Sequence, residues 1–168
     1  AAKATSSSDE TVRIFLKDSG DWGSRWNFVD DSDASAVLIT PTSSDTDFGD
    51  GLALTNNYLA VGASAEEVIY MYERSSSGWS TTSSYSFSLS AACTYSGIDC
   101  SSFSSPKYGQ NIALTDNYLA ATAVKETIFI WARDISTGVW STDTTWQLQD
   151  KINAGGNYGA SIALSDTH

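Results

Sequence analysis

Hydrophobic and polar residues recur along the chain with a long period. An aromatic residue followed by glycine opens each copy, at Phe48, Tyr108 and Tyr158, with spacings of 60 and 50 residues. Each opening leads into a short apolar stretch (GLALT, NIALT, SIALS) and then a polar turn of two residues. In the two full copies a second apolar stretch follows (YLAVGA, YLAATA). A strand, a two-residue turn and another strand predict a β-hairpin in every copy.

Two further strands are expected in each copy. The stretches at 67–74 (EVIYMYER) and 127–134 (TIFIWARD) are apolar at consecutive positions, which is typical of a strand covered on both faces. Residues 12–17 (VRIFLK) occupy the same place in an earlier copy. The stretches RWNFV (25–29), SYSFSLS and TWQLQ then alternate apolar and polar residues, which predicts strands buried on one face. One such sheet cannot cover its own apolar faces, so a repeated chain supplies the neighbours.

The predicted fold is all-β, made of tandem four-stranded antiparallel units like the blades of a β-propeller or a related array of stacked sheets. The repeats divide the chain into strands 2–4 of a split blade (1–47), a full blade with a disulfide loop (48–107), a full blade (108–157) and the first strand of the split blade (158–168). No helical periodicity is recognised. The extra residues of the first full blade, 91–107, are expected to form a loop between blades.

The two ends of the chain complement each other in this pattern. Placing YGASIALSDTH before AAKATSSSDETVRIF reproduces the internal copy YGQNIALTDNYLAATAVKETIFIW. His168 then falls at the place of Tyr118, and Ala2 at the place of Ala120. Either these residues are one period of a longer tandem polypeptide, or separate copies complete one another head to tail. A piece excised from a longer closed propeller, and an arbitrary cut through a tandem repeat, are the alternatives.

Three blades are too few to close a propeller, and bare strand edges favour pairing with another chain. A junction between copies would be heterologous, giving a ring if it closes and an open fibre if it does not. The residues expected to carry this junction belong to the last and the first apolar stretches: Ile162, Ala163, Leu164, Val12, Ile14 and Phe15.

The net charge and the cysteine content indicate which partners and which environment to expect for this chain. A net charge of −11 and a pI near 4.2 argue against nucleic acid and anionic membrane surfaces as partners. No apolar run approaches the roughly 20 residues of a membrane-spanning helix, so no membrane insertion is expected. Cys93 and Cys100 are best explained as a disulfide, worth about 2.5 kcal/mol for so short a loop, in an oxidising, extracellular setting. Serine- and threonine-rich runs at 75–84 and 100–105 are either sites of O-linked glycans or plain polar loops.

Catalytic, cofactor and metal sites are not recognised. The one histidine is His168, and neither a G-x-S-x-G nor a phosphate-binding loop occurs. Glu66 and Glu67 are neighbours at a strand entrance, where successive side chains point to opposite faces. The sequence DTDFGDG, with Asp45, Asp47 and Asp50, vaguely resembles a calcium loop but lacks its closing Glu, and hydrated turns are the simpler interpretation.

The stretch FGDGLALTNNYLAVGAS, followed by VIYMYER and a Trp, resembles the FG-GAP repeat of integrin-like β-propellers. The resemblance covers most of the chain, and it is to the type without a calcium loop, because the turns TNNY, TDNY and SDTH are too short to hold the ion. Ser64 stands where the motif has Pro, and 121–123 read ATA where it has Gly-Ala-Pro. The family implies a role in adhesion, binding or scaffolding at the cell surface or outside the cell.

The function predicted from these patterns is structural. We expect a non-catalytic extracellular repeat protein that assembles with copies of itself into a fibre or surface coat. A cell-surface adhesion or ligand-binding receptor with a closed FG-GAP propeller is the main alternative. An enzyme whose catalytic loops lie outside this segment is a weaker one.

Overall fold

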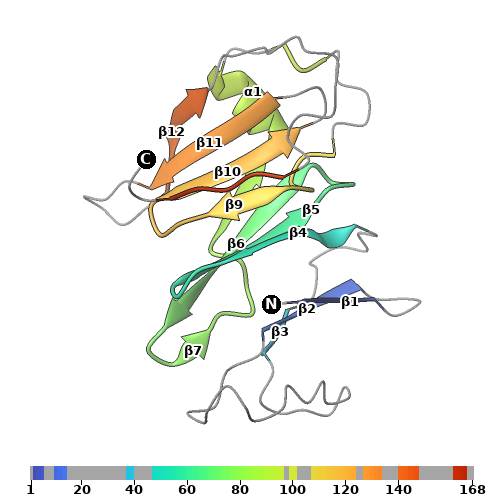
Figure 1. Cartoon of the computed structure of the whole chain (residues 1–168), viewed down its shortest axis with the longest axis vertical. Coiled ribbons are helices and arrows are strands. Elements are labelled where there is room, and N and C mark those ends of the chain that lie inside the picture. The colour runs from blue at the N-terminus through green and yellow to red at the C-terminus, as the bar shows by residue number, and fades with distance from the viewer. Residues whose placement is uncertain are drawn as a thin grey trace.

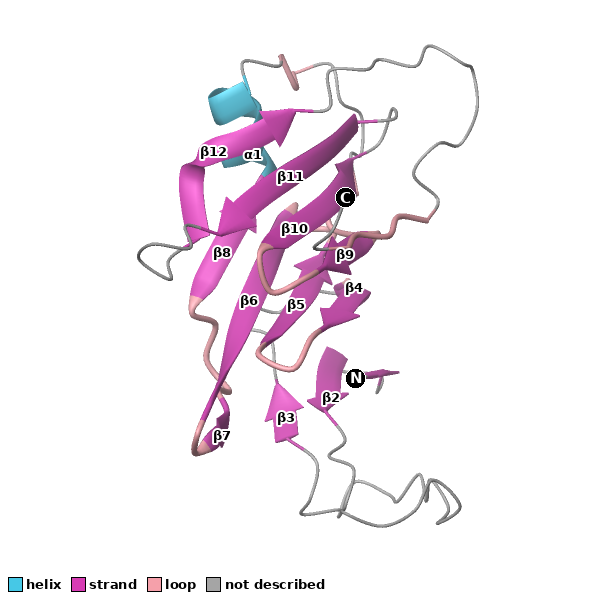
Figure 2. Cartoon of the chain, turned by 60° about the vertical axis from the view of Figure 1, so that its left-hand side comes forward, coloured by secondary structure: helices cyan, strands magenta, loops and turns pink. Residues whose placement is uncertain are grey.

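The computed structural model describes residues 2–5, 10–14, 37–39, 47–96, 99–101, 107–123, 127–133, 140–147 and 161–165 (Figure 1). Within these residues the fold is all-β, as predicted, with antiparallel sheets and a single helix. Three sheets follow one another along the long axis of the molecule, and Figure 2 shows the same succession from another side.

The first sheet has three strands in the order β1-β2-β3. β1 (Ala2–Thr5) pairs with β2 (Glu10–Ile14), which pairs in turn with β3 (Val37–Ile39). The last strand of this unit was expected at 25–29, which lies outside the described residues. In the structure β3 lies beside β2, and its Ile39 is fully buried opposite Val12.

The second sheet has five strands. β4 (Phe48–Leu54), β5 (Tyr58–Ala63) and β6 (Val68–Ser75) form a meander, and β8 (Tyr85–Ser88) pairs with the other edge of β6. The short β7 (Gly78–Trp79) closes a hairpin with the far end of β6.

The third sheet repeats this meander with four strands in the order β9-β10-β11-β12. Its strands are β9 (Ile112–Leu114), β10 (Tyr118–Ala123), β11 (Thr127–Arg133) and β12 (Trp140–Gln147). The register repeats as well, since Met71 of β6 lies opposite Tyr85 and Ile130 of β11 lies opposite Trp146.

The hairpin turns of the second and third sheets have the same hydrogen bonds. The backbone N–H of Thr55 donates to the carbonyl of Tyr58 at 2.8 Å, and its hydroxyl accepts from the backbone N–H of Tyr58 at 3.0 Å. In the third sheet Thr115 bonds to Tyr118 in the same two ways, at 2.8 and 2.9 Å. Threonine before the turn therefore holds both hairpins in one conformation.

Two apolar cores lie between consecutive sheets, and β6 contributes to both. The first core joins the first and second sheets through Val12, Ile14, Ile39, Phe48, Leu59, Val61, Ala63 and Tyr72. The second core joins the second and third sheets, and Ile69 and Met71 enter it from β6. The prediction that this strand is covered on both faces is thus confirmed.

The helix α1 (Leu89–Ser96) was not predicted, and the expectation of a loop over all of 91–107 is wrong. Leu89, Ala92 and Cys93 are buried in the second core and lie at the i, i+3, i+4 spacing of one helical face. The apolar pattern thus changes at Leu89 from a period of two to a helical one.

Candidate assembly interface

The contact between the second and third sheets shows how one repeat binds the next. Its centre is aromatic: the ring of Phe87 lies 5.0 Å from that of Trp131, and Tyr108 meets Phe129 edge to face at 5.8 Å. The indole N–H of Trp131 donates to the buried hydroxyl of Tyr108 at 3.0 Å. Burial raises the pKa of Tyr108 far above its usual value, and the bond from Trp131 lowers it by less. This hydroxyl therefore stays neutral at physiological pH.

Glycines bring the two backbones into direct contact at this interface. A Cβ added to Gly62 or to Gly51 would lie 2.0 Å from the carbonyl oxygen of Gly109. Gly109 has a φ of +87°, which also requires glycine, and Gly49 repeats this at +89°. The Tyr108-Gly109 opening of the third sheet thus fits against Gly62 in the second strand of the second sheet.

A carboxylate joins the two hairpin turns. Asp116, in the turn of the third sheet, accepts a hydrogen bond from the hydroxyl of Thr55 at 2.6 Å. Its other carboxylate oxygen accepts from the side-chain amide of Asn57 at 2.7 Å. Both partners belong to the turn of the second sheet, so the acid fixes the relative position of consecutive turns.

A cation makes the fourth contact between these sheets. Arg133, at the end of β11, donates to the hydroxyl of Tyr58 at 2.6 Å, and its guanidinium carbon lies 5.6 Å from the centre of that ring. The exposed fraction of Tyr58 is only 7%. The tyrosine therefore packs under the next repeat while its hydroxyl is hydrogen-bonded.

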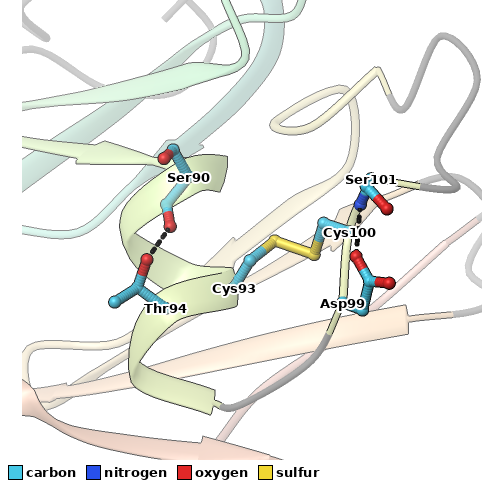
Figure 3. The surroundings of a disulfide bond; sticks show 6 residues. All are labelled: Ser90, Cys93, Thr94, Asp99, Cys100 and Ser101. Carbon is cyan, nitrogen blue, oxygen red and sulfur yellow. Dashed lines mark hydrogen bonds between the residues drawn. A yellow bond between two sulfur atoms is a disulfide. The ribbon is translucent and has the colours of Figure 1, made fainter.

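The helix and its disulfide lie beside this interface (Figure 3). Cys93 of α1 is bonded to Cys100, as the sequence predicted, with Cα atoms 6.0 Å apart, and α1 contacts β12. Next to the bridge the backbone N–H of Ser101 donates to Asp99 at 2.9 Å, and hydrogen bonds from Ser101 lower the pKa of this carboxyl. The bridge therefore ties the chain that follows α1 back onto the helix, and it indicates a non-reducing environment.

Among the residues that the structure describes, the first sheet has no strand that matches β4 and β9. In the second and third sheets this strand lies beside β5 and β10, which correspond to β1. Among the described residues β1 has only β2 as a partner, so its other side is an edge of the sheet. The IAL sequence of β9 recurs at 162–164, and 161–165 are not paired as a strand in the described structure.

The C-terminal segment lies beside the hairpin turns of the second and third sheets. Leu164 and Ser165 line an open groove of about 540 Å³ together with the two hairpin turns, namely Leu54, Thr55, Asn56, Thr115 and Asp116. Ile162 and Leu164 are half-buried, while Ser161, Ala163 and Ser165 are exposed, which is the alternation of a strand with one covered face.

The residues predicted at the junction are only partly brought together. Val12 and Ile14 are 0% and 2% exposed in the core facing the second sheet, so their side chains are already covered within the chain. Ile162, Ala163 and Leu164 lie in the C-terminal segment, and Phe15 is outside the described residues. The edge of β1, rather than the side chains of β2, offers a place for another strand.

The alignment of the two termini differs from the structure by one residue. It placed Ala2 where Ala120 lies, but Ala2 is opposite Arg13 in the β1–β2 pair. By the shared sequence pattern ET-x-x-I, Arg13 matches Phe129, and the residue opposite Phe129 is Ala121. A chain that ran directly from His168 into Ala1 would be one residue short in this hairpin.

The acidic residues of DTDFGDG take part in turn hydrogen bonds. The hydroxyl of Ser64 lies 3.0 Å from a carboxylate oxygen of Asp50 and 3.5 Å from one of Asp47, and Asp45 is outside the described residues. In the described part of the chain no group of three or more His, Cys, Asp or Glu side chains is arranged to hold a metal ion.

No family model, curated protein or solved structure matches the chain. The resemblance to the FG-GAP repeat therefore stays a prediction that depends on the motif residues. Among the described helices and strands, no helix is long and apolar enough to cross a membrane.

Proposed function

We propose that the protein is a non-catalytic, extracellular structural repeat protein that assembles head to tail with copies of itself. In this assembly residues 161–165 of one copy pair with the edge of β1 in the next. One observation carries the proposal. In the described part of the chain the first sheet has three strands, and 161–165 carry the sequence pattern of the strand that would complete it.

Strand addition of this kind is a common recognition mode. Main-chain hydrogen bonds along the added strand supply affinity, and alternate side chains supply specificity. Ile162 and Leu164 would occupy the places of Ile112 and Leu114, which are half-buried within the chain. A covalent continuation from His168 to Ala1 would have to absorb the one-residue difference in register, whereas separate copies need not.

The contact is heterologous, since the end of one copy meets the beginning of another. Repetition then gives a fibre, or a ring of propeller blades if the rotation closes. The disulfide and the serine- and threonine-rich loops fit an extracellular assembly with O-linked glycans. The stacked sheets with inter-sheet glycine contacts also fit an FG-GAP propeller, whose closed form would favour the receptor role.

The test is the association state of the purified chain by sedimentation velocity across a concentration series, followed by cryo-electron microscopy of the largest species. We expect multimers that grow with concentration, and density for 161–165 beside β1 of a neighbour. A chain that ends at residue 160 should stay monomeric.

A matched pair of variants distinguishes strand pairing from non-specific association. The double variant Ile162→Asp and Leu164→Asp should abolish association, because the carboxylates would occupy the half-buried places that Ile112 and Leu114 have in the third sheet. Ser161→Asp, at an exposed position of the same segment, should leave association nearly unchanged. A monomer at every concentration, or association that survives removal of 161–168, would overturn the proposal.

A further inference from the structure

The outer face of the third sheet is apolar and only partly covered. Side chains of β10 and β11 alternate between two faces, and Leu119, Ala121, Phe129 and Trp131 point into the core shared with the second sheet. The opposite face carries Tyr118, Ile128 and Ile130 at its margins, and Ala120 and Thr122, which are 2% and 7% exposed, on β10. Tyr118 is 36% exposed, and the two isoleucines are half-buried.

The matching face of the second sheet shows what such residues bind. There Tyr58, Ile69 and Met71 occupy the equivalent positions, with exposed fractions of 7%, 0% and 0%. All three are covered by the third sheet, whose β10 and β11 lie against β5 and β6 through Leu119, Phe129 and Trp131. The first sheet covers the opposite face of the second in turn, through Val12 and Ile14 of β2.

We propose that the outer face of β10 and β11, formed by Tyr118, Ile128 and Ile130, binds the first sheet of a second copy of this chain. This inference rests on the proposed head-to-tail assembly and adds a side-chain surface to its strand pairing. The succession of sheets indicates which surface would bind there. Each sheet within the chain is covered by the next, and the third sheet lacks a successor in the described structure. The C-terminal segment, beside the turn of β9, already marks where that successor begins.

The geometry of the occupant follows from the repeat. A first sheet completed by residues 161–165 would have four strands, like the third sheet. It would then place β1 and β2 over β10 and β11, as β10 and β11 lie over β5 and β6. The hydroxyl of Tyr118 would take the place that Tyr58 has within the chain, beneath the edge of the covering sheet.

The experiment measures association of the full chain and of variants on this face. Ile128→Lys and Ile130→Lys should each weaken association about tenfold or more, because a lysine would be buried against the second copy. Ser86→Lys, at an exposed position on β8, serves as the matched control and should associate like the unaltered chain. Thermal melting of each monomer at low concentration separates loss of binding from loss of folding.

A photo-crosslinking residue in place of Tyr118 gives a second readout that does not depend on stability. Cross-links between copies should join position 118 to peptides of residues 1–14. The same residue at Ser77, an exposed turn position, should give no cross-link between copies.

The two proposals fail in different ways. If the chain associates through 161–165 but the lysine variants associate equally well and position 118 cross-links elsewhere, the outer-face inference is wrong while strand pairing stands. If the unaltered chain does not associate at all, the proposed function fails, and this inference fails with it.

Discussion

The second and third sheets have the same meander and the same hairpin hydrogen bonds, yet their burial differs. In the second sheet Ile69 and Met71 are completely buried, while Ile128 and Ile130 at the matching positions of the third are half-buried. In the described structure the second sheet has a neighbouring sheet on each side, whereas the third sheet has one on one side only. The apolar pattern of a strand therefore indicates the neighbours it requires, and an incompletely covered copy of that pattern points to a missing one.

Among the changes that test this comparison, replacement of Gly62 by alanine should lower the free energy of unfolding most. Its Cβ would lie 2.0 Å from a backbone oxygen of Gly109, so the two sheets must move apart. We expect a loss of about 3 kcal/mol in the free energy of unfolding, measured by urea denaturation. Thr122→Ala, at the same position of the third sheet, is the control and should cost about 1 kcal/mol or less. Equal losses would show that the close approach is not specific to the second sheet.

Removal of the disulfide should have the second-largest effect on the free energy of unfolding. The double variant Cys93→Ser and Cys100→Ser frees the chain that follows α1, the helix of the second repeat, and should lower the free energy of unfolding by about 2.5 kcal/mol. A reductant should shift the melting temperature of the unaltered chain in the same direction and leave the double variant unchanged. A reductant effect on the double variant would contradict this assignment.

The carboxylate between the turns should contribute less. Asp116→Ala removes two hydrogen bonds to Thr55 and Asn57, which are partly exposed to water, and should cost about 1 kcal/mol. The control is Asn56→Ala, because Asn56 is the exposed residue at the matching place in the second sheet. Loss of the same size from both variants would mean that the acid has no specific role in joining repeats.

The smallest effect on stability should be visible only at alkaline pH. Burial, with a lesser contribution from Tyr70, raises the pKa of Tyr72 to about 12 from its usual value of 10.0. Because the unfolded chain loses this proton first, the stability that Tyr72 contributes is intact below pH 10 and falls as the pH rises towards 12. Tyr72→Phe should therefore flatten the decline in melting temperature between these pH values. An unchanged decline would assign it to other groups.

Local patterns predicted much of the fold. The hairpins at Thr55 and Thr115 follow from apolar stretches separated by polar turns, and the coverage of β6 on both faces follows from its consecutive apolar residues. The spacing of Cys93 and Cys100 favoured the disulfide. These features depend on residues close together in the chain, where periodicity is informative.

What was missed depends on tertiary contacts. The helix begins where β8 ends, and its buried positions, Leu89, Ala92 and Cys93, were hidden within an apparently strand-like run. The bonds from Thr55 and Asn57 to Asp116 join residues about sixty positions apart, and no spacing rule relates them. The register of β1 against β2 differed by one residue from the alignment of the termini, because register within a hairpin is decided by pairing and not by alignment.

The contact of Gly62 with Gly109 has a mechanical consequence for a filament of such copies. Within a copy the absent side chain lets the second and third sheets touch through their backbones, so bending between these two sheets would force backbone atoms together. Thr122 occupies the matching position of the third sheet, and in the proposed assembly its side chain would hold the following backbone further away. Such a filament would be stiff between the second and third sheets of each copy and would bend more easily at the joints between copies.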